Sequence, residues 1–355
     1  MNMSLQQIRQ ARYDAVRNLL RKHHVSAMVL THNIDQFYLT GFFFYPEEAV
    51  FVIYPKGVAC FTRGLYLQPF GKYAPEVEIY SHDNGQLEAA LEFVRKKKLS
   101  HVGFDATKEN YLSGKKMREA GCVELPCLIS QLREVKDAEE LKRTREACRI
   151  AYRAYEYVKT RVKTGMMECE VAAMLESFMR MQGATGTPFQ TIVAFGEGAA
   201  NPHYKTSTRK LQKEDAILLD FGCIYKGYTS DISRCWWHGK HEPAEYTKIW
   251  KIVDKARNTG IKAAKIGTRT KDVDAAARGV IEASGYGKYF THRTGHGIGI
   301  ENHEEPYNSP DSKRVLVEGN IFSVEPGIYL PGKFGVRLED TVVATKKGPQ
   351  VYTKK

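Results

Sequence analysis

The strongest constraint on the fold comes from two strand-forming runs, Ile217–Ile224 and Tyr228–Trp237. They flank the short turn Tyr225–Gly227, and this pattern predicts a β-hairpin. Asp220 and Asp231 lie symmetrically about the turn, so we expect both side chains on one face with Cβ atoms about 5 Å apart. When two carboxylates lie that close, their repulsion raises the pKa of one of them unless a cation lies between them. Taken alone, the motif also fits a chance pair of aspartates beside a turn.

Three further residues with metal-binding side chains follow in the last third of the chain. They are His296 in TGHGIG, Glu325 in SVEPGIY and Glu339 in VRLED. Each lies at a strand-forming run or a glycine-rich junction, from which a side chain can point into a shared pocket. Together with the two aspartates they supply four carboxylates and one imidazole, which is enough to hold two divalent metal ions.

These motifs resemble the pita-bread metallopeptidases, a family that contains methionine aminopeptidase, aminopeptidase P and prolidase. The matching segments are DFG, TSDISR, GHGIG, EPGIY and RLED, and they occur in the order found in the family. The resemblance implies a dinuclear metal centre whose ligands are Asp220, Asp231, His296, Glu325 and Glu339. It also implies that Glu325 both binds metal and carries protons during catalysis.

The resemblance assigns roles to other side chains. His203 matches the family position that contacts substrate and the developing oxyanion, and His303 matches the second catalytic histidine. His292 either lines the substrate pocket or bonds to the backbone. Arg337 lies two residues before Glu339, so we expect it on the same strand face, where a cation can orient a metal-binding carboxylate. The simpler alternatives are structural histidines and an ordinary surface arginine.

Two domains are expected. Alternating helices and strands predict a self-contained α/β N-terminal domain over residues 1–130. It resembles the creatinase-like N-domain of aminopeptidase P and prolidase, including the segment Asn33–Phe42, and methionine aminopeptidases generally lack this domain. Residues 131–355 then form the catalytic domain, which the resemblance implies is an α+β pita-bread fold. We expect it to open with one long charged helix over residues 131–164.

The net charge of +12 is the unusual feature of the composition. The densest basic run, Arg95–Lys98, closes a predicted helix, where cations are favourable, so we expect no binding of nucleic acid. No apolar run is long enough to span a membrane, and no signal peptide is evident. The seven cysteines are scattered without CxxC spacing, which favours reduced thiols. We therefore expect a cytoplasmic protein that does not bind membranes.

The resemblance further implies hydrolysis of Xaa-Pro bonds in proline-containing peptides, by a protein that forms a homodimer. Several dipeptide-restricted prolidases carry an arginine after the proline of their HExP segment. Here Tyr307 follows Pro306 and is expected to line the substrate site. The sequence thus favours an Xaa-Pro aminopeptidase over an Xaa-Pro dipeptidase, although Arg293 or Arg337 could supply a substitute charge.

The carboxylate-rich ligand set suits hard or borderline ions. Mn²⁺ is the first expectation, and Co²⁺, Zn²⁺ or Fe²⁺ are alternatives. A different class of function is also open, because creatinase and non-enzymatic binding proteins share this fold without the metal ligands. The presence of all five ligand residues argues against that class.

Overall fold

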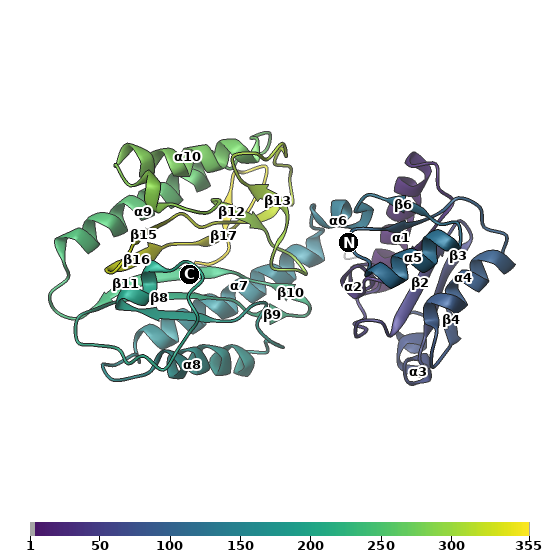
Figure 1. Ribbon diagram of the computed structural model, residues 1–355, viewed down its shortest axis with the longest axis horizontal. Helices are drawn as coiled ribbons and strands as arrows, with labels where there is room; N and C mark the ends of the chain where they lie inside the picture. The colour runs from purple at the N-terminus through teal and green to yellow at the C-terminus, as the bar shows by residue number, and fades with distance from the viewer. Residues whose placement is uncertain (1–3, 355) are drawn as a thin grey trace. The chain divides into compact units, whose positions relative to one another are not determined.

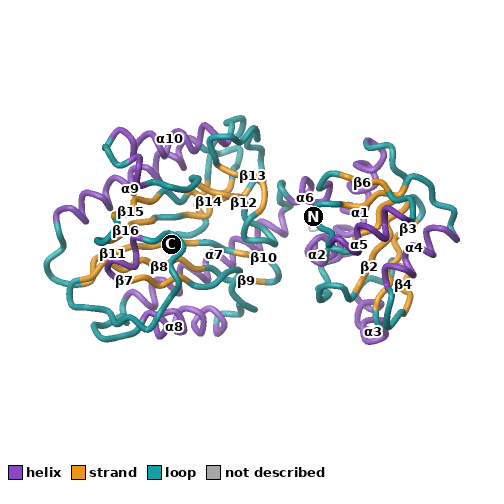
Figure 2. Tube along the Cα trace, viewed as in Figure 1, coloured by secondary structure: helices purple, strands orange, loops and turns teal. Residues whose placement is uncertain are grey.

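The computed structural model describes residues 4–354 and divides the chain into two compact units. One unit comprises the described residues up to Arg133, and the other begins at Glu134. The sequence had placed this boundary between residues 130 and 131. Figure 1 shows the elements of each unit along the chain, and Figure 2 shows their division into helices, strands and loops.

The N-terminal unit contains a six-stranded mixed sheet with the order β4-β3-β2-β1-β5-β6. Strand β2, AVFVIY, is buried along its whole length, as expected for a strand covered on both faces. The helix that opens the unit begins at a capping box formed by Ser4 and Gln7, which satisfies two backbone N–H groups. The elements are α1 (Leu5–Lys22), β1 (Ala27–Leu30), α2 (Asn33–Thr40), β2 (Ala49–Tyr54), β3 (Gly57–Thr62), α3 (Gly64–Tyr73), β4 (Glu78–Ser81), α4 (Gln86–Lys96), β5 (Val102–Asp105), α5 (Tyr111–Glu119), β6 (Val123–Leu125) and α6 (Leu128–Arg133).

A buried ion pair joins two helices of this unit. Arg133 Nη1, at the end of α6, lies 2.8 Å from Asp35 Oδ1 in α2, and the two side chains are 2% and 1% exposed. His32 Nδ1 lies 3.1 Å from the other oxygen of Asp35. Burial alone raises the pKa of Asp35, but the His32 hydrogen bond and the Arg133 charge outweigh burial and lower it. Asp35 is therefore a buried carboxylate whose negative charge is balanced.

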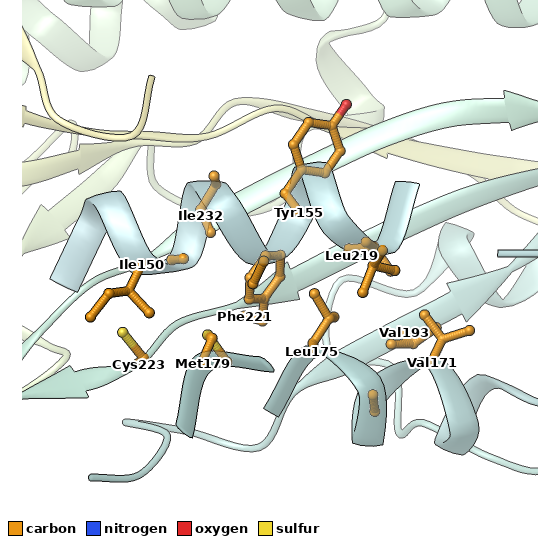
Figure 3. Close-up of a cluster of buried hydrophobic side chains, with 14 of the residues drawn as sticks. Ile150, Tyr155, Val171, Leu175, Met179, Val193, Leu219, Phe221, Cys223 and Ile232 are labelled. Atoms are coloured by element: carbon orange, nitrogen blue, oxygen red, sulfur yellow. The ribbon is translucent and has the colours of Figure 1, made fainter. Parts of the chain in front are cut away.

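The unit that begins at Glu134 corresponds to the expected catalytic domain and is called the catalytic unit. Two helices at its start pack on a three-stranded sheet of order β11-β8-β7. Figure 3 shows the apolar side chains gathered between α7, α8 and this sheet. The elements are α7 (Ala138–Lys159), α8 (Glu168–Met181), β7 (Ile192–Phe195), the 3₁₀ helix η1 (Gly196–Ala200), β8 (Asp215–Phe221), β9 (Ile224–Tyr225), β10 (Tyr228–Thr229) and β11 (Ile232–His238).

The prediction of one helix over residues 131–164 was wrong. The chain forms two helices, α6 and α7, with a break between Arg133 and Ala138. Asp137 accepts hydrogen bonds from the backbone N–H groups of Glu139 and Glu140, each 2.9 Å long. The Glu140 side chain accepts the N–H of Asp137 in return. This capping box starts a new helix at Ala138, which explains the break.

The predicted hairpin also differs from the structure. It is divided into two ladders, β8–β11 and β9–β10, and the register pairs Asp220 with Ser233 rather than with Asp231. The chains approach closely between the ladders, where a Cβ on Gly222 would lie 1.9 Å from the Ser230 carbonyl oxygen. Asp231 lies just outside β11, two residues before Ser233. Strand parity therefore still places it on the face of Asp220.

The second half of the catalytic unit places two antiparallel helices beside a five-stranded sheet of order β13-β12-β14-β17-β18 and the hairpin β15–β16. No helix within residues 4–354 is long and apolar enough to cross a membrane. The elements are α9 (Ala244–Ala263), α10 (Thr270–Ala283), the 3₁₀ helix η2 (Gly287–Tyr289), β12 (Gly295–Gly297), β13 (Glu304–Asn308), β14 (Ile321–Val324), β15 (Gly327–Leu330), β16 (Phe334–Arg337), β17 (Asp340–Val343) and β18 (Gln350–Val351).

Candidate metal centre

The five residues expected to bind metal all lie at or beside strand ends in the catalytic unit. Asp220 lies near the end of β8, and Asp231 lies between β10 and β11. His296 is the middle residue of β12, Glu325 lies between β14 and β15, and Glu339 directly precedes β17. Strand ends leave the polar side chains free of the core while the strands themselves fix their positions.

The structure brings these side chains together around His296. Its Nε2 atom lies 3.2 Å from Glu325 Oε1 and 3.6 Å from Asp231 Oδ2. Potential ligand atoms of Asp231, His296 and Glu339 all lie within 4.8 Å of one another. Asp231, His296 and Glu339 are 4%, 4% and 1% exposed, so the centre is buried and acidic.

Three of the carboxylates carry a buried oxygen that has no hydrogen-bond partner in the described part of the chain. These atoms are Asp220 Oδ1, Asp231 Oδ1 and Glu339 Oε1. Burial raises the pKa of all three groups, and the charge of neighbouring carboxylates further raises the pKa of Asp231 and Glu339. Unpaired buried carboxylates are costly, and a cation among them removes both the repulsion and the missing bonds.

The imidazole of His296 is oriented for the same cation. Its Nδ1 lies 3.1 Å from the Gly297 carbonyl oxygen, and a carbonyl only accepts hydrogen bonds, so Nδ1 carries a proton. Burial lowers the pKa of His296, but the hydrogen bond and charge of Glu325 and the charge of Asp231 outweigh burial and raise it, which favours a proton on Nε2 as well. A divalent cation bound at Nε2 would take the place of that proton. Carbonyl-bound histidines with a free second nitrogen are typical metal ligands. The geometry and the burial of these donor atoms therefore fit the binding of divalent ions.

Glu325 differs from the other carboxylates. Burial raises its pKa, but the hydrogen bond and charge of His296 outweigh burial and lower it to about 2. Ser323 Oγ also donates to Glu325 Oε1 over 3.1 Å. Its side chain is 16% exposed, so Glu325 lies at the edge of the centre that solvent reaches.

Arg337 does not lie on one strand face with Glu339, as the sequence had predicted. It ends β16, whereas Glu339 precedes β17, so no single strand holds both. Its Nη2 instead pairs with Asp220 Oδ2, and its Nε donates to Ser233 Oγ over 3.0 Å. Ser233 Oγ in turn donates to Glu339 Oε2 over 2.8 Å. A chain of two hydrogen bonds through the Ser233 hydroxyl thus connects the Arg337 side chain to that of Glu339.

The predicted histidines lie at different depths. The rings of His303 and His296 are 4.0 Å apart and nearly perpendicular. Burial lowers the pKa of His303 to about 4, and the nearby charges of His296, Arg293 and His203 act in the same direction. His203 is exposed and directly follows Pro202, whose carbonyl accepts a hydrogen bond from Arg337 over 3.4 Å.

His292 is held by hydrogen bonds at both ring nitrogens. Nδ1 lies 2.8 Å from the Arg293 carbonyl oxygen, and Nε2 lies 2.8 Å from the Tyr329 hydroxyl. The Tyr329 hydroxyl also accepts from Arg337 over 2.9 Å. His292 is therefore fixed in position beside the centre and offers no free nitrogen to a metal.

A cavity of about 1030 Å³ lies beside these residues and is lined by His292, Arg293 and Tyr307. The Arg293 guanidinium lies over the Tyr307 ring, 4.4 Å from its centroid. Lys313 and Arg314 also line this cavity. Glu305 and Asp311 line it too, and Arg314 pairs with Glu134. The cavity is therefore of mixed charge, and the Arg293 guanidinium is a candidate for binding a negatively charged group there.

Three residues for which the sequence predicted no role are connected to the site in the structure. They are Ser233, which joins Arg337 to Glu339; Tyr329, which joins Arg337 to His292; and Asn302, whose Nδ2 donates to Asp231 Oδ2 over 3.1 Å. Ser233 and Tyr329 stand inside the motifs TSDISR and EPGIY. Strand parity with Asp231 was the available signal for Ser233.

Comparison with known proteins identifies both units. A family model described as metallopeptidase family M24 matches residues 142–346, and one described as the creatinase/prolidase N-terminal domain matches residues 12–135. The expected succession of an α/β creatinase-like domain and an α+β pita-bread domain is thereby confirmed.

Similar proteins of known sequence or structure extend over almost the whole chain. The uncharacterized peptidase YqhT of Bacillus subtilis is 34% identical over 96% of this chain and 97% of that protein. The structure of an Xaa-Pro dipeptidase from Bacillus anthracis has a TM-score of 0.93 and 34% identity, covering 98% of each chain. That of an X-Pro aminopeptidase from Thermotoga maritima has a TM-score of 0.86 and 31% identity, covering 94% of this chain and 96% of the other. Both kinds of Xaa-Pro peptidase are therefore among the similar structures.

Proposed function

Because the chain belongs to metallopeptidase family M24, we propose that it hydrolyses Xaa-Pro bonds at a dinuclear metal centre and prefers free dipeptides. The observation that carries the preference is the Arg293 guanidinium over the Tyr307 ring, in a cavity that His292 also lines. A dipeptide presents a free carboxylate next to its scissile bond, and a longer peptide does not.

The metal ligands in this proposal are Asp220, Asp231, His296, Glu325 and Glu339. Divalent ions held there supply Lewis acidity, which polarises a carbonyl group and acidifies water. Mn²⁺ is the ion we propose first, because oxygen donors outnumber the single imidazole. Arg337 and Ser233 position two of these carboxylates, since both contact carboxylate oxygens directly.

Glu325 is the residue to which we assign proton transfer. Its carboxylate lies at the edge of the centre that solvent reaches, where it can accept a proton from the attacking water. That proton then passes to the proline nitrogen as the C–N bond breaks, and the new C–O bond completes the carboxylate product. The partial exposure of Glu325 allows it to reach both groups.

His203 and His303 are assigned to the substrate. The lowered pKa of His303 makes its ring neutral at neutral pH, so one nitrogen can donate a hydrogen bond while the other accepts. His203 lies on the exposed side, next to the Pro202 carbonyl that Arg337 binds. A hydrogen bond from either ring to the scissile carbonyl would favour the tetrahedral, negatively charged state.

Several dipeptide-restricted prolidases have an arginine where this chain has Tyr307. We assign the role of that arginine to Arg293. Tyr307 stacks against the guanidinium and restricts its orientation, which lowers the entropy lost when a carboxylate binds. Arg337 is unsuited to this task because it is 2% exposed and paired with Asp220.

An Xaa-Pro aminopeptidase is the second candidate, and the size of the cavity favours it. About 1030 Å³ exceeds what a proline carboxylate needs, so residues beyond proline have room. The similar structures include an X-Pro aminopeptidase as well as an Xaa-Pro dipeptidase.

The deciding experiment compares hydrolysis of Ala-Pro, Ala-Pro-amide and Ala-Pro-Ala by the Mn²⁺-supplemented protein, with an EDTA control. We expect Ala-Pro to be cleaved with the highest kcat/KM, because only it places a carboxylate beside Arg293. Arg293→Ala should raise KM for Ala-Pro by roughly tenfold or more, as loss of a charge-assisted hydrogen bond does. It should leave cleavage of Ala-Pro-amide unchanged.

Lys313→Ala is the matched control, since it removes another cation that lines the same cavity. We expect KM for Ala-Pro to stay within about twofold of its value in the unmodified protein, because charges at the protein surface contribute little free energy. Faster cleavage of Ala-Pro-Ala than of Ala-Pro would reject the dipeptidase in favour of the aminopeptidase. No metal-dependent cleavage of any of the three peptides would reject both.

A further inference from the structure

A second cavity lies on the opposite face of α7 from the apolar core of the catalytic unit. It has a volume of about 890 Å³ and is bounded by α7, α8 and the C-terminal residues 349–354. None of its lining residues belongs to the candidate metal centre. Pockets of 300–1,000 Å³ are typical of sites for small organic ligands.

One wall of this cavity is strongly basic. Arg145, Arg149 and Arg153 follow one another at intervals of four residues on α7, so they lie along one face of the helix over about 12 Å. Arg149 pairs with Glu146 over 2.5 Å. Arg153 is exposed and forms no ion pair within residues 4–354. Lys354 adds a fourth cation to the lining.

Aromatic rings form the rest of the wall. Tyr157 of α7 and Phe178 of α8 are stacked, with centroids 4.5 Å apart and an angle of 26° between their planes. Tyr352 lies under the Arg145 guanidinium at 4.7 Å, and its hydroxyl lies 3.3 Å from Arg145 Nη2. Both Tyr157 and Phe178 are half-buried, so each presents part of its surface to the cavity.

From this combination we propose that the cavity binds a nucleoside di- or triphosphate. Arg149 already pairs with Glu146, and Glu156 also lines the cavity. Arg145, Arg153 and Lys354 are the cations that remain to meet a ligand with several negative oxygens. Tyr157 is covered by Phe178 and by the Arg161 guanidinium, which lies 3.9 Å from its centroid. The accessible part of Phe178 is therefore the surface on which a planar base can stack. A ligand that lacks either the base or the phosphate chain leaves one part of the wall unused.

The proposal is tested by calorimetric titration of the full chain with ADP, inorganic phosphate and adenosine. We expect saturable binding of ADP at one site per chain. Phosphate and adenosine should each bind roughly tenfold more weakly or worse, because each makes only half of the contacts. Equal affinity for phosphate and ADP would overturn the nucleoside assignment, and no binding of ADP would overturn the proposal.

Two variants separate a built site from general attraction to a basic protein. Arg153→Glu should weaken ADP binding by roughly tenfold or more through loss of a charge-assisted contact. Lys142→Glu makes the same charge change on α7 outside the cavity and should leave ADP affinity unchanged. Equal weakening by both variants would mean non-specific attraction and would overturn the proposal.

Phe178→Leu keeps an apolar side chain but removes one ring of the stacked pair. We expect it to weaken ADP binding and to leave the weaker binding of phosphate unaltered. If Arg153→Glu instead changes the molar mass of the protein in solution and ADP does not bind, the cavity is a contact between copies of the chain, and the nucleotide site is refuted.

Discussion

Asp35 in the N-terminal unit and Asp231 in the catalytic unit are both buried carboxylates, at 1% and 4% exposure. Asp35 is paired with Arg133 and His32, and its pKa is lowered. Asp231 has one oxygen without a partner in the described chain, and its pKa is raised well above the ordinary value. The protein thus balances one buried charge with its own side chains and leaves the other for a cation from outside.

The two buried acids therefore contribute differently to the stability of the protein. A carboxylate that the chain itself neutralises stabilises the structure, and its loss leaves a buried cation without its partner. A carboxylate that the chain leaves uncompensated costs stability until an ion binds. The same substitution, aspartate to asparagine, should therefore have opposite effects on stability at the two positions.

The largest effect is expected for Asp231→Asn in the metal-supplemented enzyme. Ala-Pro hydrolysis should fall by more than roughly a hundredfold. Substitution of residues that only hydrogen-bond a metal ligand costs up to about that factor, and Asp231 is proposed to be a ligand itself. The melting temperature of the EDTA-treated variant should equal or exceed that of the EDTA-treated unmodified protein, because repulsion is removed. Asp272→Asn, on the surface of the same unit, is the control. Near-normal hydrolysis by Asp231→Asn would remove the distinction between the two acids.

Asp35→Asn should act in the opposite direction. We expect a loss of about 3 kcal/mol of unfolding free energy, since breaking a buried pair is strongly destabilising. Calorimetric melting of the full chain measures it. Asp14→Asn is the matched control, because Asp14 is 54% exposed and pairs with Arg17 on the surface, where a pair contributes at most about 1 kcal/mol. A smaller loss at Asp35 than at Asp14 would contradict the comparison.

Ser233→Ala should weaken metal binding in the catalytic unit while leaving all of the carboxylates in place. It removes the hydroxyl that joins Arg337 to Glu339 without removing a carboxylate. We expect Mn²⁺ affinity, measured by titration, to fall by roughly 10–100-fold, as for other groups that orient ligands. Ser177→Ala on the exposed face of α8 should leave the affinity unchanged, and equal affinities in both variants would assign Ser233 to packing alone.

The smallest expected effect is on how the stability of the protein depends on pH. The folded-state pKa of Asp35 lies below its unfolded value, so its charge stabilises the fold above the unfolded pKa of about 3.9. This contribution is lost as pH falls through the folded pKa. The difference in melting temperature between the unmodified protein and Asp35→Asn should therefore be largest near neutral pH and narrow at about pH 3. A difference that widens in acid would contradict the ionised pair.

The sequence predicted which side chains gather but not how they are held. Five motifs in family order indicated Asp220, Asp231, His296, Glu325 and Glu339, and the structure brings these residues to one place. Their role as ligands stays a prediction. Family membership and the two-domain succession are confirmed.

Two of the three failures arose where contacts between distant parts of the chain decide the geometry. Pairing Asp220 with Asp231 assumed an uninterrupted hairpin, and the close approach at Gly222 shifts the partner to Ser233. The partner of Arg337 depends on how β16 lies beside β8, which no local pattern specifies. The break before α7 was readable from Asp137 and Glu140 as a capping box, but helical periodicity on both sides concealed it.

The site is also assembled from distant parts of the sequence. Asp220 and Arg337 are 117 positions apart, and Ser233 and Glu339 are 106 positions apart. Contacts of such long range form late in folding, because the intervening chain must first be ordered. Divalent ions can then stabilise the finished centre but contribute little to the transition state. We expect metal to slow unfolding and to leave the folding rate almost unchanged, so metal supply governs how long a folded molecule persists rather than how quickly it forms.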